Sequence, residues 1–122
     1  MKIGLFTNCF YDKSWEEVCK TTNEVGIKVL EVGAGALNGK SHCNPGKLLK
    51  DYNAIKKFKD TAKKYHIEIG SLACMGNYLH PNKKIADEHT KDLENAIELA
   101  SMLEIKVVNG FAGCPGAAED AL

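Results

Sequence analysis

Short runs rich in β-branched residues alternate with amphipathic helical segments along the whole chain, and this alternation limits the fold more than any other feature of the sequence. Strands are expected over residues 2–7, 28–32, 66–72 and 106–110. Helices are expected between them, over residues 14–26, 51–65 and 83–103. Strict alternation is typical of parallel strands joined by right-handed crossovers. The sequence therefore predicts an α/β fold with the order β-α-β-α-β-α-β.

Each expected helix has an apolar face, and the first also has clear end signals. Ser14 and Glu17 have the spacing of a capping box, and Gly26 supplies a left-handed stop for the same helix. Asn44 and Pro45 open a turn ahead of the second helix. The residues expected on the apolar faces are Trp15, Val18, Thr22 and Val25 in the first helix, Tyr52, Ile55, Phe58, Ala62 and Tyr65 in the second, and Ile85, His89, Leu93, Ala96, Ile97, Ala100 and Leu103 in the third.

Two architectures fit this order of elements. A doubly wound, flavodoxin-like sheet is a complete domain at a length of 122 residues. The alternative is the first half of a (β/α)₈ barrel, which needs roughly 250 residues in full. The half-barrel is favoured because the strands carry polar residues at alternate positions, whereas a sheet covered on both faces reads more uniformly apolar. These polar positions are Lys28, Glu31, Glu68, Ser71 and Asn109.

The end of the chain also favours the half-barrel. Residues 117–122 stand where a fourth helix is expected to begin, so that the last unit looks cut. We therefore expect residues 1–122 to form a single domain, a partial TIM barrel. Strand order distinguishes the two folds, since 1-2-3-4 with all helices on one side indicates the half-barrel and 2-1-3-4 with helices on both sides indicates the doubly wound sheet.

Composition excludes several classes of partner. The chain has 16 basic and 16 acidic residues, which gives no electrostatic footprint for nucleic acid or an anionic membrane. The lysines of the second helix lie mostly opposite its apolar face and are expected to be solvated. The apolar run at the N-terminus is too short for a signal peptide or a membrane span, and five cysteines without a CxxC pair suit a reducing compartment. A cytoplasmic location is therefore expected.

Gly, Asn, His and Cys gather in the segments that follow the four strands. The connections at the opposite ends of the strands are short and plain. Because the functional loops of parallel α/β folds lie at the carboxyl ends of the strands, this asymmetry predicts a site on that face. The four segments are 8–9, 33–43, 74–81 and 111–116.

The runs at 33–45, 76–81 and 113–116 resemble the sugar phosphate isomerase/epimerase family, which belongs to the xylose isomerase-like TIM barrels. The resemblance covers essentially the whole chain but only about the first half of a family member. It implies an enzyme with a divalent metal (Mn, Mg, Co or Zn) that moves a proton or hydride between adjacent carbons of a sugar or polyol. One small departure is Glu104, where relatives usually have the glycine that ends the helix.

In that family the Glu, Asp and His residues that hold the metal come mostly from later strands. No catalytic residue and no metal ligand is therefore assigned in this chain. We expect the chain to contribute only contacts to substrate, and we expect it to have no turnover alone.

Four residues are candidates for those contacts: Asn77, His80, His42 and Glu31. Asn77 offers a donor and an acceptor to a polyhydroxylated ligand, or it stabilises its own turn. His80, followed by Pro81, donates to substrate hydroxyls or is a peripheral metal ligand, unless it caps the third helix. His42 is either a further contact or simply solvated. Glu31 lies near the mouth of the second strand, where it orients substrate or pairs with a neighbouring lysine.

Three other patterns are interpreted as structural or accidental. Residues 34–41 fit a loosened phosphate-loop pattern, but 42–46 break the helix that such a loop must open. Cys9, Cys43, Cys74 and Cys114 share the loop face with two histidines, but they lack the close pairs typical of zinc sites. His66 and His89 are interpreted as structural, since they fall at a strand start and on a helix face.

The alternative to an enzyme fragment is a small non-catalytic α/β module that binds a partner or itself. A half-barrel has two open strand edges and an uncovered inner sheet face, which invite pairing. A homodimer through these edges is therefore expected.

Overall fold

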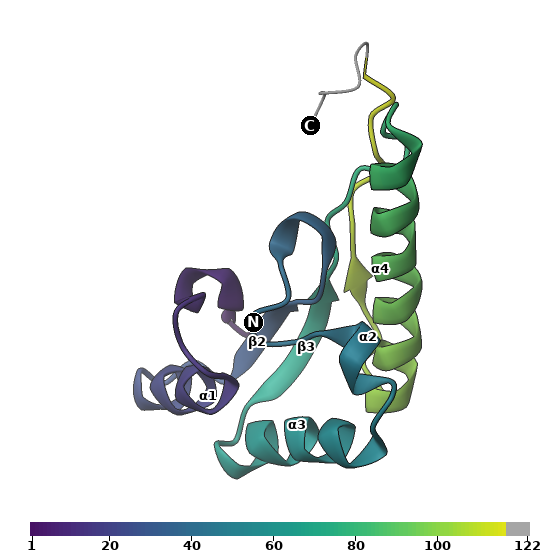
Figure 1. The fold of residues 1–122 in the computed structure, drawn as a ribbon. Coiled ribbons are helices and arrows are strands. Elements are labelled where there is room, and N and C mark those ends of the chain that lie inside the picture. Colours follow the sequence, from purple (N-terminus) through teal and green to yellow (C-terminus); the bar gives the residue numbers. More distant parts are fainter. Residues whose placement is uncertain (117–122) are drawn as a thin grey trace.

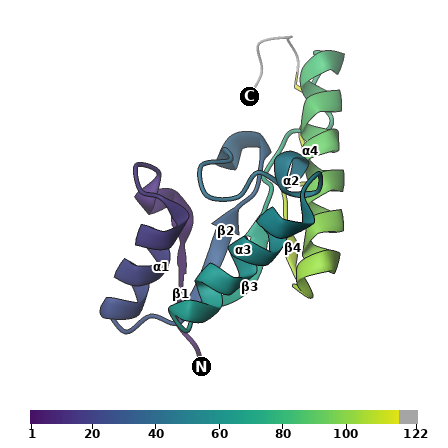
Figure 2. The ribbon, with the colours of Figure 1, turned by 60° about the horizontal axis from the view of Figure 1, so that its bottom comes forward.

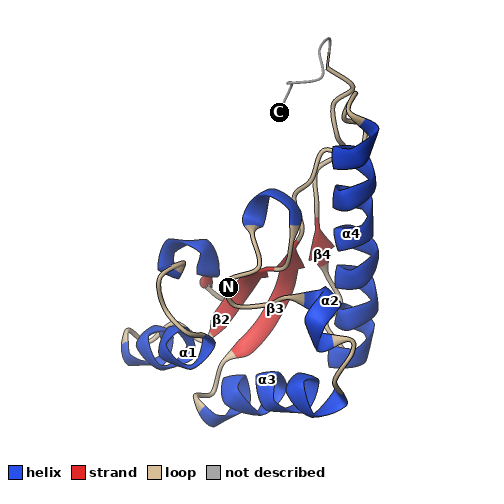
Figure 3. Cartoon of the chain, in the orientation of Figure 1, coloured by secondary structure: helices blue, strands red, loops and turns tan. Residues whose placement is uncertain are grey.

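A computed structural model, in which residues 1–116 are described, contains one sheet of four parallel strands in the order β1-β2-β3-β4. The same order in sequence and in space confirms the half-barrel expected from the sequence. The doubly wound alternative is wrong, because it requires the first strand to lie between the second and the third. The strands are β1 Gly4–Phe6, β2 Val29–Gly33, β3 Glu68–Ala73 and β4 Val108–Asn109 (Figures 1 and 3).

Helices connect the strands and lie along one side of the sheet. In Figure 2, α1 lies beside β1, α3 in front of β2 and β3, and α4 beside β4. A parallel sheet with an outer layer of helices is half of a (β/α)₈ barrel. The helices are α1 Trp15–Glu24, α2 Pro45–Leu48, α3 Tyr52–Lys64 and α4 Lys83–Leu103, with two short 3₁₀ turns, η1 Thr7–Phe10 and η2 Ala36–Asn38.

The hydrophobic core lies between the sheet and these helices. Leu30, Val32 and Leu72 point to the helices and are 0% exposed. Trp15 of α1 stacks on Phe58 of α3 with ring centroids 4.5 Å apart, and its indole N–H donates to the Phe58 carbonyl at 3.0 Å. The core is therefore continuous from the sheet through to the helix–helix contacts.

The expected helix ends are largely confirmed. The capping box of Ser14 and Glu17 is present, and α4 spans residues 83–103 as predicted. Gly26, with φ of 81°, provides the left-handed stop after α1. The first and fourth strands are shorter than expected, because the backbone turns into η1 at Thr7 and only Val108 and Asn109 of the last run form a strand.

Three residues placed on apolar faces are instead exposed, so those assignments were wrong. Val25 is 63% exposed because it follows the last residue of α1, and Tyr52 is 74% exposed at the first residue of α3. Ile97 is 53% exposed, while Leu99, not assigned to the face, is 0% exposed. On α4 the buried stripe begins at Ala96, and Ile97 lies about 100° around the helix from it.

The inner face of the sheet is not covered by a helix, and it is lined by polar and small residues. A register shift between Leu30 and Glu31 shows a bulge on β3, after which Glu31 pairs with Ser71. At the amino end of the strands, the ammonium of Lys2 lies 2.5 Å from the Glu68 carboxylate. The polar strand positions used to predict the half-barrel therefore include residues of an inner face.

Two further expectations concern the limits of the chain. The cut expected at residues 117–122 lies outside the described residues. Within the part of the chain that is described, no helix is long and apolar enough to cross a membrane.

Candidate functional site

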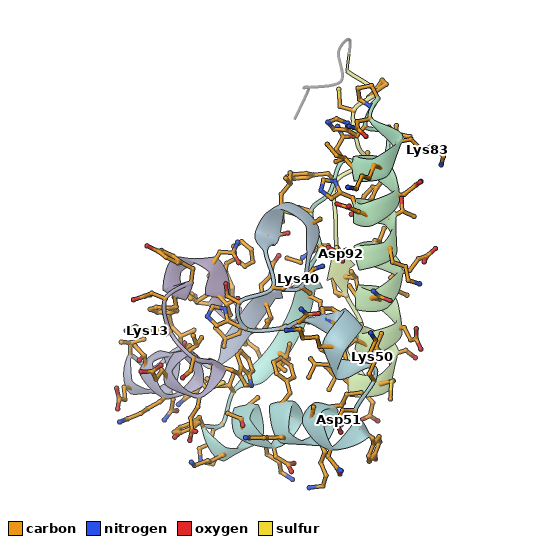
Figure 4. All side chains as sticks on the ribbon, in the orientation of Figure 1. Lys13, Lys40, Lys50, Asp51, Lys83 and Asp92 are labelled. Carbon is orange, nitrogen blue, oxygen red and sulfur yellow. The ribbon has the colours of Figure 1, made fainter. Side chains whose placement is uncertain are left out.

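The loop that follows β2 is fastened to α4 by one carboxylate. Asp92 accepts the Ala36 N–H at 2.8 Å on one oxygen and the Lys40 ammonium at 2.6 Å on the other. Figure 4 shows Lys40 and Asp92 meeting between the loop and the helix. Gly35, with φ of 135°, lets the loop backbone lie this close to the side chain of Asp92, because a Cβ at this residue would lie only 3.0 Å from that side chain.

The loops after β2 and β3 are also bonded to each other. The Asn38 side-chain oxygen accepts the Met75 N–H at 2.6 Å, and the Leu37 N–H donates to the Met75 carbonyl at 3.1 Å. The Tyr78 hydroxyl donates to the Cys74 carbonyl, and burial is the main cause that raises the pKa of this tyrosine. The two loops therefore form one connected rim at the carboxyl end of the sheet.

Asn77 joins this rim to the segment after β4. Its side-chain oxygen accepts the Cys114 N–H at 2.8 Å and the Leu79 N–H at 3.3 Å. Its own N–H donates to Nδ1 of His89 on α4 at 2.9 Å. The residue is 5% exposed. The turn-stabilising role considered for Asn77, and the structural role expected of His89, are both present in the structure.

The two loop histidines are held on different sides of the rim. Nδ1 of His80 accepts the N–H of Asn82, the N-cap residue of α4, at 2.9 Å. Nε2 of His42 lies 2.9 Å from the Phe10 carbonyl in η1, and this histidine is 8% exposed. The interpretation of His42 as a solvated residue was therefore wrong, because the chain after β1 covers it.

Glu31 lies on the inner face of the sheet, not in a loop. Its Oε1 accepts the side-chain N–H of Asn109 at 3.2 Å, across β3. Phe6 on β1 and Ser71 on β3 are its register partners, so a row of side chains crosses the sheet near its carboxyl end. The described partner of Glu31 is an amide, so the lysine pairing considered as its alternative role is not the one in the structure.

Two members of this row were not selected as site residues from the sequence. Asn109 was noted only as a polar strand position, and Phe6 was not selected. Strand alternation could have placed Asn109 on the face opposite the apolar Val108, but it could not have selected Phe6, whose neighbour Leu5 is also apolar. The register between strands, which places Phe6 beside Glu31 and Asn109 beside Ala73, was not visible in the sequence.

A small pocket opens beside Asn77 at the rim. Its volume is about 350 Å³, and the segment after β4 forms one wall. The lining residues are Leu37, Gly76, Asn77, Phe111, Ala112, Gly113 and Cys114. The pocket combines apolar walls with one buried amide, a composition typical of small-ligand sites.

The cysteines do not build a metal or redox centre in the part of the chain that is described. Cys43 and Cys74 are buried, and burial raises the pKa of these thiols to about 12 and about 11. Cys9 and Cys114 are exposed. Among residues 1–116, no three His, Cys, Asp or Glu side chains come together as a metal site would require, so these residues alone do not fit a divalent-metal centre.

The phosphate-loop pattern at 34–41 is not a phosphate loop in the structure. Lys40 is paired with Asp92, and the next helix, α2, begins only at Pro45. A phosphate loop needs its Lys and Ser to open a helix whose N–H groups face the phosphates. The lysines at 56, 57, 59, 63 and 64 are all exposed, as expected of a solvated face.

Comparison with known proteins gives a likeness in structure alone. No family model and no curated protein sequence matches the chain. A crystal structure of D-psicose 3-epimerase, determined in the presence of D-fructose, is similar with a TM-score of 0.58 and 13% identity. The match covers 90% of this chain and 37% of the epimerase chain. The fold is therefore that of part of a TIM barrel, and this chain spans well under half the length of that neighbour.

Proposed function

We propose that this chain forms the amino-terminal wall of a sugar isomerase or epimerase barrel. The row of Glu31, Ser71 and Asn109 on the uncovered inner face, directly below the fastened rim loops, carries this proposal. The likeness to D-psicose 3-epimerase supports it, as does the resemblance in the rim segments. In this proposal the chain binds and orients a sugar or polyol.

The chemistry of the row suits vicinal hydroxyl groups. Among the described residues, only Asn109 donates a hydrogen bond to Glu31, which leaves acceptor capacity on the carboxylate. Hydrogen bonds from hydroxyls to an ionised carboxylate are stronger than those between neutral groups. Phe6 lies beside the carboxylate and presents an aromatic ring to the same space.

At the rim, Asn77 and His80 would complete the contacts. Both are buried and held by backbone N–H groups, so that each has a fixed position. His42, against η1, would contribute on the opposite side of the rim. The proposed role of all four side chains is to position substrate.

The resemblance implies a divalent metal that would polarise the sugar carbonyl when bound. The described residues do not gather three ligands for it, so the proposal uses no metal step in this chain. The cytoplasmic location and the absence of nucleic-acid or membrane partners remain part of the proposal.

Sugar binding to the chain tests this proposal. We expect saturable NMR shift changes at Glu31, Asn77 and Asn109 on titration with D-fructose or a ketose phosphate, with a dissociation constant of about 1 mM because half the wall is absent. The Glu31→Gln variant should weaken binding about tenfold. Glu68→Gln is the matched control, since this glutamate lies on the same face at the other end of the strands.

Two results would contradict the proposal. The first is the absence of any saturable shift with both sugars, and the second is an equal loss of affinity in the two glutamine variants.

Turnover is a separate readout. Added Mn²⁺ or Mg²⁺ with a panel of ketoses should give no epimerisation by the isolated chain, and epimerisation would show that the chain is not merely one wall.

A further inference from the structure

The two outer strands of the sheet leave backbone groups unpaired on opposite edges. β4 uses the carbonyls of Val107 and Asn109 to accept the Leu72 and Cys74 N–H groups of β3. Because backbone groups alternate in direction along a strand, the N–H and C=O of Val108 point away from the sheet. β1 is paired only with β2, so its other edge is also open among the described residues.

Apolar side chains stand beside both edges. Ile3, ahead of β1, is 70% exposed, and Val107, ahead of β4, is 45% exposed. On α4, Ile97 and Met102 are 53% and 45% exposed. Unpaired strand edges next to exposed apolar side chains are typical of surfaces that pair with another chain.

The exposed area of the chain is large enough for such an interface. The chain exposes 7400 Å², whereas a compact monomer of 13.3 kDa is expected to expose roughly 6,500 Å². Part of the excess belongs to the segment after β4, where residues 111, 112 and 114–116 are exposed. An ordinary stable interface buries ~800 Å² of each partner, so the chain exposes enough surface for one.

We propose that two copies of this chain close an eight-stranded ring, in which β4 of each copy pairs in parallel with β1 of its partner. The two edges of one copy have the same strand direction, so β4 can continue directly into β1 of another copy. Such a head-to-tail contact closes into a ring only if the rotation from one copy to the next brings the free β4 edge of the last copy to the free β1 edge of the first. The likeness to a TIM barrel shows that the four strands already have the curvature of part of a closed barrel. Two copies then supply the eight strands that a filled barrel needs.

The ring would also complete the rim. Each copy brings loops to the carboxyl end of its four strands, so the dimer would carry two copies of Glu31 and Asn109 around one interior. The inner positions Gly4, Gly33 and Gly70 are small and leave that interior room. This inference does not rest on the proposed sugar chemistry, because association is measured without any sugar.

Sedimentation equilibrium of the 122-residue chain tests the ring, compared with two edge variants and one control. We expect a mass of twice 13.3 kDa at micromolar concentration. Ile3→Lys and Val107→Lys should each raise the dimer dissociation constant at least about tenfold, because each variant damages both junctions of the ring. Tyr52→Lys is the control, since Tyr52 is 74% exposed on α3, away from both edges.

Several outcomes would overturn the proposal. The wild-type chain could sediment as a monomer. This result can be interpreted without any variant, and it would mean that the strand edges do not pair with a second copy of the chain. The chain could form open polymers, which would show that the rotation does not close. Loss of the dimer in only one edge variant would indicate a symmetric contact of β1 with β1 or of β4 with β4. Circular dichroism of each variant shows whether a loss of association reflects unfolding.

Discussion

At the residue scale, Asp92 has the largest structural role among the charged side chains. Its two oxygens hold the backbone and the lysine of the loop after β2, and its side chain is 17% exposed. The other described ion pairs are more exposed, and exposed pairs contribute little to stability. Asp92 therefore determines where this part of the rim lies.

We predict that Asp92→Ala lowers the free energy of unfolding by about 1.5–3 kcal/mol, the usual cost of losing hydrogen bonds to a charged group. Glu94→Ala is the control, because its ion pair with Lys91 is exposed and its loss should cost less than about 0.5 kcal/mol. Urea denaturation measures both values. Equal effects of the two variants would show that Asp92 does not anchor the loop.

Glu104 is a residue whose backbone conformation opposes its side chain. It ends α4 in the left-handed region, with φ of 61°, where a residue with a Cβ is strained. We predict that Glu104→Gly stabilises the fold by about 0.5–1 kcal/mol, after the loss of chain entropy and of the exposed pair with Lys59. Glu104→Gln keeps the strain and should not stabilise. A rise in melting temperature with glutamine as well would contradict the strain argument.

The cysteines are expected to fall into two groups in their reactivity. Because burial raises the pKa of Cys19 and Cys43 to about 12 and that of Cys74 to about 11, these thiols stay protonated and covered at pH 8. We predict that iodoacetamide modifies only Cys9 and Cys114 in the native chain, and all five cysteines in denaturant. Peptide mass spectrometry identifies the sites. Modification of Cys43 at the native rate of Cys114 would contradict the described burial.

The sequence could point to the loops that carry the candidate site, but not to the side chains that hold them. Asn77 and His80 could be selected because both follow a strand. Asp92 could not, since it lies 56 residues from Ala36 and resembles any solvated helix position. The role of His42 could not be predicted either, because its partner is a carbonyl 32 residues earlier in the chain.

At the element scale, α4 fastens the rim. It supplies Asp92 to the loop after β2 and His89 to the loop after β3, and these two residues are three positions apart on one face. The helix bounds could be predicted because caps and periodicity are local. The ends of the strands could not, since they depend on which neighbouring backbone groups are available for pairing.

We predict that His89→Ala speeds hydrogen exchange of the Asn77 amide by about tenfold or more, because this partly buried N–H loses its acceptor. Glu88→Ala, at the exposed neighbouring position of α4, is the control and should leave the exchange rate unchanged. Hydrogen exchange followed by NMR gives the rate for each amide. Unchanged exchange at Asn77 in His89→Ala would show that the helix does not hold this loop.

At the scale of the whole molecule, one arrangement explains both the core and the site. The helices cover the outer face of the sheet and bury Leu30, Val32 and Leu72, while the inner face keeps its polar row. The alternating polar positions in the strands predicted this division. That residues 1–122 form a single domain stays a prediction, since it includes residues beyond the described ones.

The order of the strands in solution tests this account most directly. Backbone NOEs of the 122-residue chain should connect Leu5 with Leu30, Leu30 with Ile69, and Leu72 with Val108, as the described register requires. That pattern is the order 1-2-3-4 of a half-barrel with an open inner face. NOEs that connect β1 with β3 would place the first strand inside the sheet, and the inner wall proposed for sugar binding would then not exist.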